Sequence, residues 1–192
     1  ISPYTLPDGT VVSTDDCIRP GTTYEKVSQL SPVFRPDGTV TAGNACPLND
    51  GAAAVVVMSD TRAAELGIKP LARIISSGVS ALSPEIMGLG PIQAIRQALG
   101  RAGMTPDDID LFEINEAFAA QVLPSADEIG IDLDKLNVNG GAIALGHPFG
   151  MTGARIMTTL LNGLEDTDGE FGVESMCVGG GQGMAMVVQR LR

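Results

Sequence analysis

From residue 71 to the C-terminus, apolar runs of strand length alternate with longer segments whose apolar residues recur at helical spacing. The expected strands cover 71–79, 110–115, 171–178 and 184–191, and the expected helices cover 91–102, 117–129 and 152–164. Gly103 and Gly130 follow the first two helical segments, where glycine commonly ends a helix. Because alternating strands and helices place helices on both faces of one sheet, this pattern predicts an α/β layered domain.

The first 48 residues show no such periodicity. Two turn signals stand out, at Leu6-Pro7-Asp8-Gly9 and Arg35-Pro36-Asp37-Gly38. A long irregular stretch cannot form a core of its own, so we expect 1–48 to lie on another part of the protein.

The next stretch, 52–58, contains only alanine, valine and methionine, which is typical of a strand buried on both faces. Ser59 or Asp60 is expected to cap a short helix that runs to Leu66 and stops at Gly67. The residues 51–56 also resemble 183–188, as the last strands of two duplicated halves would.

Composition excludes several kinds of partner. With 23 acidic and 12 basic residues the net charge is −11, so we expect no nucleic-acid partner. No apolar stretch is long enough to span a bilayer, so no membrane partner is expected. Three widely spaced cysteines and a single histidine argue against both a zinc site and a disulfide framework, and favour a reducing, cytoplasmic location.

Three glycine-rich segments stand out, at 137–141, 146–150 and 177–183. Glycine lets backbone N–H groups approach a ligand closely. The segments lack both the Lys-Ser/Thr that ends a P-loop and the G-x-G-x-x-G pattern of dinucleotide-binding loops. A different chemistry is therefore expected at these loops.

Three polar side chains suit acyl chemistry. His147, between Gly146 and Pro148, could act as a general base or hydrogen-bond donor. Cys177 ends a strand shortly before a run of glycines, so its thiol is expected to be partly accessible beside N–H groups that could hold an oxyanion. Asn115 ends another strand, where its amide could orient a water or a carbonyl.

Each of these residues also has a structural interpretation. A cysteine can be a small buried residue, a histidine before proline can be a turn residue, and a strand-final asparagine can cap a helix. For Cys17 and Cys46, which lie in the loop-like region without a base nearby in sequence, the structural interpretation is preferred.

Several segments together resemble the thiolases, which are coenzyme-A-dependent acyltransferases, in both order and spacing. They are Asn115-Glu116-Ala117-Phe118-Ala119, 137–148, Gly153-Ala154-Arg155 and Cys177-Val178-Gly179-Gly180-Gly181, with 43–45 and 49–53 upstream. The resemblance covers essentially the whole chain. The stretch 148–153 is similar to thiolases of degradative, sterol-related pathways.

The resemblance implies a role for each residue. His147 activates the acyl-accepting cysteine and contributes a donor to one oxyanion hole, and Asn115 holds the water that completes this hole. Cys177 is the acid/base that exchanges a proton with the acetyl carbon, and the Gly179 N–H forms half of a second oxyanion hole. The implied contacts to coenzyme A fall on Ser76, Met87 and Phe118.

One family motif is missing from this chain. The acylated nucleophile of thiolases lies in an Asn-x-x-Cys-x-Ser-like motif, whereas Cys17, Cys46 and Cys177 are followed two places on by Arg19, Leu48 and Gly179. We therefore expect the second half of a duplicated αβαβα thiolase fold, completed by a missing N-terminal half. The expected parts are 1–48, the end of the loop domain; 49–68, the last strand and helix of the N-terminal core domain; and 69–192, the C-terminal core domain.

The expected function is thiolytic cleavage of 3-ketoacyl-CoA in fatty-acid degradation, or the reverse Claisen condensation of acetyl-CoA. Coenzyme A would be a co-substrate, with no permanently bound cofactor and no metal. The alternative is a non-catalytic acyl-CoA binding or assembly module, and a ketosynthase-like enzyme is a weaker third possibility. The resemblance also implies a homodimer or homotetramer, and the half chain alone should expose apolar surface.

Overall fold

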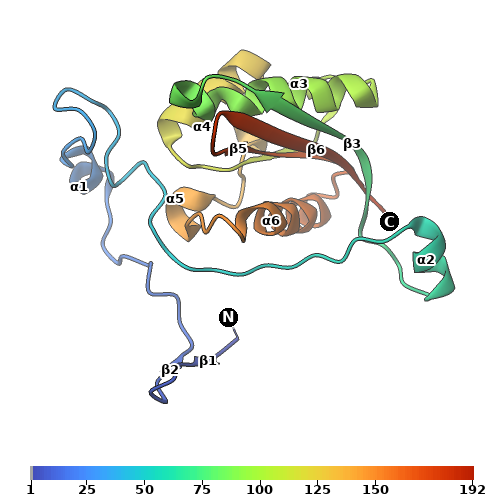
Figure 1. Cartoon of the computed structure of the whole chain (residues 1–192), viewed down its shortest axis with the longest axis horizontal. Coiled ribbons are helices and arrows are strands. Elements are labelled where there is room, and N and C mark those ends of the chain that lie inside the picture. Colours follow the sequence, from blue (N-terminus) through green and yellow to red (C-terminus); the bar gives the residue numbers. More distant parts are fainter. Residues whose placement is uncertain (1) are drawn as a thin grey trace.

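The computed structural model describes residues 2–192, and a four-stranded sheet forms its centre (Figure 1). The strand order is β3–β6–β5–β4, with β3 (Ala72–Ala81), β4 (Leu111–Ile114), β5 (Phe171–Val178) and β6 (Gln182–Arg190). β6 pairs antiparallel with both β3 and β5, while β4 and β5 run parallel. All four strands predicted between residue 71 and the C-terminus are confirmed.

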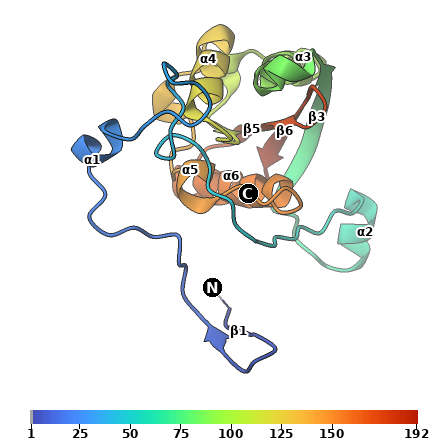
Figure 2. The same ribbon diagram turned by 60° about the vertical axis from the view of Figure 1, so that its left-hand side comes forward.

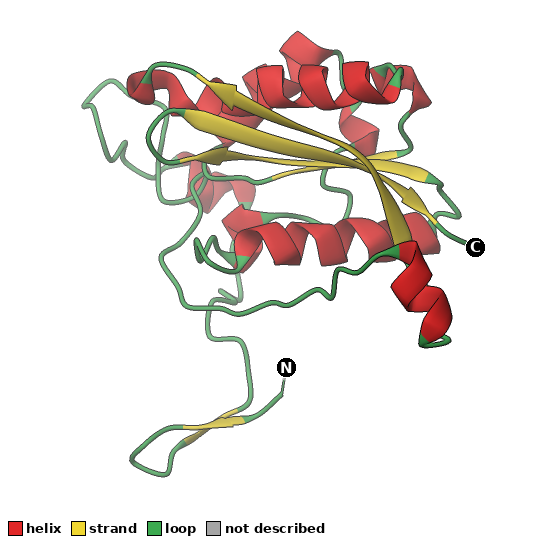
Figure 3. Ribbon diagram, turned by 45° about the vertical axis from the view of Figure 1, so that its right-hand side comes forward, coloured by secondary structure: helices red, strands yellow, loops and turns green. Residues whose placement is uncertain are grey.

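Helices cover both faces of this sheet. α3 (Gly90–Ala102) and α4 (Ala119–Ile129) lie on one face, and α6 (Thr152–Asp166) lies on the other (Figure 3). Side chains alternate along β6, so that Val187 joins the core under α3 and α4 while Val188 packs against Leu160 and Leu164 of α6. The predicted α/β fold with an αβα arrangement of layers is confirmed.

The predicted ends of two helices are also confirmed. Gly103 and Gly130 follow α3 and α4 in the left-handed conformation, with φ of 67° and 84°. Their N–H groups bond back to the last turn, which satisfies carbonyls that would otherwise lack partners. Shorter helices within the layered body are α5 (Ala142–Leu145) and the 3₁₀ helices η1 (Pro84–Leu89), η2 (Pro106–Asp108) and η3 (Leu133–Lys135).

Part of the last glycine-rich segment serves packing. The first turn of α3 lies directly on β6, where the backbones of Gly90 and Gly183 meet. A Cβ atom on either residue would overlap the backbone of the other. Glycine at 183 is therefore required by the contact between helix and sheet.

The N-terminal region is irregular, as predicted for 1–48. Its described residues, 2–48, form only the short strands β1 (Tyr4–Thr5) and β2 (Val11–Val12) and the short helix α1 (Tyr24–Ser28). Figure 2 shows β1 extending away from the layered body. Both turn signals form turns, with Gly9 N–H bonded to the Leu6 carbonyl and Gly38 N–H to the Arg35 carbonyl.

The prediction of a buried strand at 52–58 is wrong for this structure. The segment has no strand pairing, and Val56 and Val57 are 84% and 72% exposed. A strand forms only beside another strand, and the described residues place none next to this segment. The helix that follows, α2 (Asp60–Glu65), does form, with the Ser59 hydroxyl accepting from the Arg62 N–H. None of the described helices has the length and apolar character needed to cross a membrane.

Candidate active site

Asn115 and Cys177 lie at adjacent strand ends. β4 and β5 are parallel neighbours, so their carboxyl ends meet at one edge of the sheet, where sites of α/β proteins commonly form. Asn115 follows β4 directly and its backbone N–H donates to the Ser175 carbonyl at 2.9 Å, two residues before Cys177 on β5.

The side chain of Asn115 is fully buried, with no exposed surface. Neither its Oδ1 nor its Nδ2 has a hydrogen-bond partner among the described residues. It does not cap the following helix, because the residue at the N-cap position of α4 is Phe118. A buried amide without partners costs about 1–3 kcal/mol, so this group is suited to holding a water or a substrate oxygen.

Cys177 is only 5% exposed, so the expectation of a partly accessible thiol is wrong. The residue lies within β5, which has a neighbouring strand on each side and helices on both faces. Burial raises the pKa of the Cys177 thiol, and a hydrogen bond from the backbone partly opposes this rise. The thiol is therefore protonated at neutral pH and is a proton donor in its resting state.

The turn between β5 and β6 contains three consecutive glycines with different surroundings. Gly180 and Gly181 adopt φ of 86° and 85°, and Gly181 lies against the backbone of Leu82. Gly179 is exposed, and a Cβ atom built on it would meet no atom within 4 Å. Of the three, Gly179 has the most room beside its backbone for a ligand.

His147 lies in the loop between α5 and α6. Its ring is half-buried, and its Nδ1 is 2.6 Å from Oγ1 of Thr152. Burial, and then the nearby charge of Arg155, lowers the pKa of the imidazole. The ring is therefore neutral at pH 7 and can accept a proton. It lines an open hollow together with Leu48, Asn49, Asp50, Pro148 and Phe149.

The segment 44–50 joins the Asn115 side of this edge to the His147 loop. Asn44 accepts from the Ala119 N–H at 2.9 Å, and the Cys46 N–H donates to Ala117 at 3.1 Å. Further along, Asn49 Nδ2 donates to the Leu145 carbonyl at 3.3 Å. The segment thus runs along one end of the layered body. Convergence of the imidazole with the thiol and the amide stays a prediction.

Sequence reasoning missed the position of Cys46. The residue lies beside Ala117, and its thiolate form would raise the pKa of the Cys177 thiol. The resemblance of the flanking segments 43–45 and 49–53 to a family segment was the signal that could have placed it here. Cys17, in contrast, lies in an irregular stretch beside Asp15 and Asp16.

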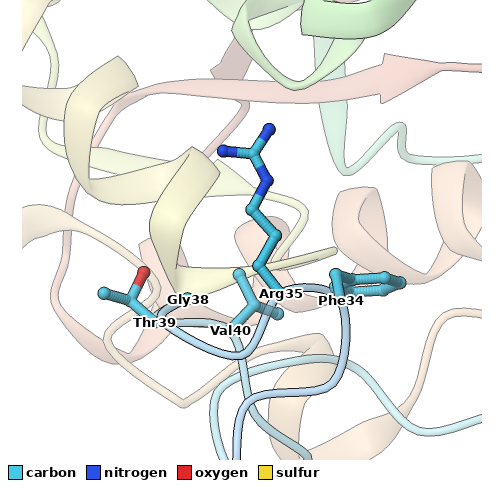
Figure 4. Close-up of a pocket in the computed structure, with 5 residues that line it drawn as sticks. All are labelled: Phe34, Arg35, Gly38, Thr39 and Val40. Carbon is cyan, nitrogen blue, oxygen red and sulfur yellow. The ribbon is translucent and has the colours of Figure 1, made fainter.

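The three residues predicted to contact coenzyme A lie in different surroundings. Phe118 is half-buried, with its ring edge-on to Phe34 at a centroid distance of 5.9 Å. Phe34 and Arg35 line a small hollow, from which the Arg35 side chain extends away from its loop (Figure 4). Met87 is half-buried in η1, and the Ser76 hydroxyl donates to the Ala98 carbonyl of α3 at 2.6 Å. Their contacts to coenzyme A stay predictions.

A buried charged cluster lies under the N-terminal half of α6, and sequence reasoning missed it too. Glu113 and Glu174 are direct partners in the β4–β5 pairing, and Arg155 of α6 lies 3.8 Å from the Glu113 carboxylate. Burial raises the pKa of Glu113 to about 7 and that of Glu174 to about 8, and in each case Arg155 opposes the rise. The signal in the sequence was a glutamate inside each of two apolar strands.

Family models match almost the whole chain. The model described as "Thiolase, N-terminal domain" matches residues 1–61, and that described as "Thiolase, C-terminal domain" matches residues 68–190. An acetyl-CoA acetyltransferase of Thiocystis violacea is 50% identical over 100% of this chain and 50% of its own length. A 3-ketoacyl-CoA thiolase of Cronobacter sakazakii is 56% identical over 92% of this chain and 47% of its own length.

Solved structures agree with this match. The acetyl-CoA acetyltransferase of Bacillus anthracis superposes with a TM-score of 0.94 at 47% identity, over 100% of this chain and 49% of that one. Human mitochondrial 3-ketoacyl-CoA thiolase in complex with CoA gives a TM-score of 0.88 at 44% identity, over 98% and 48%. The chain thus spans about half the length of the relatives it matches. Both the family models and the shared fold show that it belongs to the thiolase superfamily.

Proposed function

We propose that this chain supplies one half of the active site of a thiolase, which cleaves 3-ketoacyl-CoA with coenzyme A or runs the reverse Claisen condensation of acetyl-CoA. The observation that carries the proposal is the buried, unpartnered amide of Asn115 beside the Cys177 strand end. Family membership and the relatives' names support the reaction class. The acyl-accepting cysteine would come from the N-terminal half, because the Asn-x-x-Cys-x-Ser-like motif is not in this sequence.

In the thiolytic direction, a thiolate of the N-terminal half attacks the 3-keto carbon and the bond between C2 and C3 breaks. The electron pair of that bond moves to C2 and forms the enolate of an acetyl thioester. The Cys177 thiol, which its raised pKa keeps protonated until this step, then gives its proton to C2. Finally the thiol of coenzyme A takes the acyl group, and its proton returns to the Cys177 thiolate.

Charge that develops on oxygen in these steps needs donors that are already in place. One oxyanion hole is proposed to consist of a water held by the Asn115 amide and an N–H group of the His147 ring. The Gly179 N–H is proposed to form half of a second oxyanion hole. The neutral imidazole of His147 would also take the proton of the nucleophilic thiol. Coenzyme A would lie along Phe118, Met87 and Ser76.

Partners and setting complete the proposal. The exposed stretch at 55–57 and Phe149, which is 85% exposed, are surfaces that an N-terminal half could cover. The complete protein would form a homodimer or homotetramer, as the resemblance implies. Three unpaired cysteines in the described chain support a reducing, cytoplasmic setting. The stretch 148–153 supports a degradative role.

The test is thiolysis of acetoacetyl-CoA by the complete protein, with this chain joined to its N-terminal half. Replacing Cys177 with alanine should lower kcat by about 10²–10⁴-fold, because that is the usual contribution of general acid–base catalysis. Cys17→Ala is the matched control and should retain the wild-type rate, since Cys17 lies in an irregular, largely exposed stretch. An unchanged rate in the Cys177 variant would refute the acid/base role. Binding of acyl-CoA without turnover by the wild type would favour the non-catalytic module.

A further inference from the structure

The hydroxyl of Thr152 touches two groups of the His147 loop. Thr152 is the first residue of α6 and has no exposed surface. Its Oγ1 lies 3.0 Å from the carbonyl oxygen of Pro148 and 2.6 Å from Nδ1 of His147. Both are hydrogen-bond distances.

Counting hydrogens fixes the direction of both bonds. A threonine hydroxyl has a single hydrogen, and a carbonyl oxygen can only accept. Two oxygens 3.0 Å apart with no hydrogen between them would repel, so the hydroxyl hydrogen belongs between Thr152 and Pro148. The contact with His147 then needs its hydrogen from the ring, on Nδ1.

We propose that Thr152 holds His147 as the Nδ1–H tautomer, which leaves the lone pair on Nε2. Histidine in water prefers the opposite tautomer, so the protein must impose this one. Arg155, one turn further along α6, adds a positive charge that disfavours a second proton on the ring. Thr152 is therefore a positioning residue that acts through the imidazole.

The catalytic consequence rests on the proposed thiolase function. A thiol can be deprotonated only by a ring nitrogen that carries a lone pair, so Nε2 becomes the base for the nucleophile of the N-terminal half. After the transfer, the Nδ1–H bond to Thr152 holds the charged ring in the orientation it had when neutral.

The test uses ¹⁵N NMR of this chain, because His147 is its only histidine and gives the only imidazole signals. The wild type should show a protonated Nδ1 and an unprotonated Nε2 at pH 7.5. Thr152→Ser keeps the hydroxyl and should give the same tautomer. Thr152→Val removes it and should make the Nε2–H form the major one.

Thr158→Val is the matched control. Thr158 makes the same hydroxyl bond to a carbonyl four residues earlier, at 2.8 Å to Ala154 on the same helix, but is exposed on its surface. This variant should leave the tautomer unchanged. Backbone amide spectra report whether each variant folds. If Thr152→Val does not fold, Thr152→Ala replaces it as the variant that lacks the hydroxyl.

Two results would overturn the inference: an Nε2–H ring in the wild type, or an unchanged tautomer in a folded variant that lacks the hydroxyl. Neither readout uses turnover. The tautomer assignment can therefore be refuted while the thiolysis assay supports the proposed function, and the proposed function can be refuted while the tautomer assignment holds.

Discussion

At the scale of single residues, the site is built from groups whose burial works against the fold. Asn115 buries an amide that has no partner within the described part of the chain, and Glu113 and Glu174 bury two carboxyl groups beside Arg155. Each arrangement costs stability, because buried polar groups lose their hydration. Such costs are typical of functional sites, where local rules of stability are commonly broken.

Glu174 gives a prediction about pH. Its pKa in the folded chain is raised to about 8 from an ordinary value of 4.5, so the folded state holds a proton that the unfolded chain has lost. The contribution of this carboxyl to stability is therefore greatest below pH 4.5 and is lost as the pH rises to 8. Glu174→Gln cannot ionise at this position. Its melting temperature should equal that of the wild type near pH 5 and should be several degrees higher than that of the wild type at pH 8.5.

Thermal unfolding of both proteins, followed by circular dichroism from pH 5 to pH 8.5, measures this difference. Glu165→Gln, on the exposed surface of α6, is the control and should show no such dependence on pH. A melting-temperature difference between Glu174→Gln and the wild type that stays constant over this range would contradict the assignment.

At the scale of helices and strands, packing explains the glycine-rich segments as much as ligand binding does. Gly183 lies where β6 meets the backbone of α3, whereas Gly179 has open space around it. Gly183→Ala should therefore destabilise the fold by about 1–3 kcal/mol, the usual cost of overpacking. Gly179→Ala, the matched control, should change stability by less than about 0.5 kcal/mol.

Urea denaturation of the two variants measures these free energies of unfolding. Equal stability of Gly183→Ala and Gly179→Ala would show that the close contact between α3 and β6 is not needed. A large loss in the Gly179 variant would mean that this glycine has a structural role.

The elements that sequence predicted well are those with local signals. Gly103 and Gly130 end their helices through backbone conformation, and periodic apolar residues give each helix a face to bury. The segment 52–58 was predicted wrongly because its residues favour a strand, but the partner strand is not a local property. The bond between Thr152 and His147 depends on the residue at which α6 begins. The contact of Cys46 with Ala117 joins two segments that are far apart in the sequence. Neither is visible in residue spacing.

At the scale of the whole molecule, the chain forms an αβα layered body but leaves an apolar segment exposed at 55–57. Val56 and Val57 are exposed beside Val55 in a segment that is apolar enough to be buried. We expect the isolated chain to self-associate through this surface. Val56→Lys should shift the chain toward the monomer, because a charge opposes burial of the segment.

Analytical ultracentrifugation at several concentrations measures this shift. Val11→Lys, which places the same charge on an exposed valine of β2, is the control and should associate like the wild type. An equal degree of association for Val56→Lys and the wild type would show that the apolar segment is not the contact surface.

The most direct test of the account is deuterium exchange at the acetyl carbon of acetyl-CoA. The complete protein in D₂O should place deuterium on C2. When one acetyl-CoA acylates the nucleophile, the departing CoA thiolate takes the Cys177 proton, and the Cys177 thiolate then removes and returns a proton at C2 of a second acetyl-CoA. The wild type and Cys17→Ala should exchange at equal rates by mass spectrometry, and Cys177→Ala should not exchange above the rate without protein. Exchange by Cys177→Ala at the wild-type rate would contradict the account.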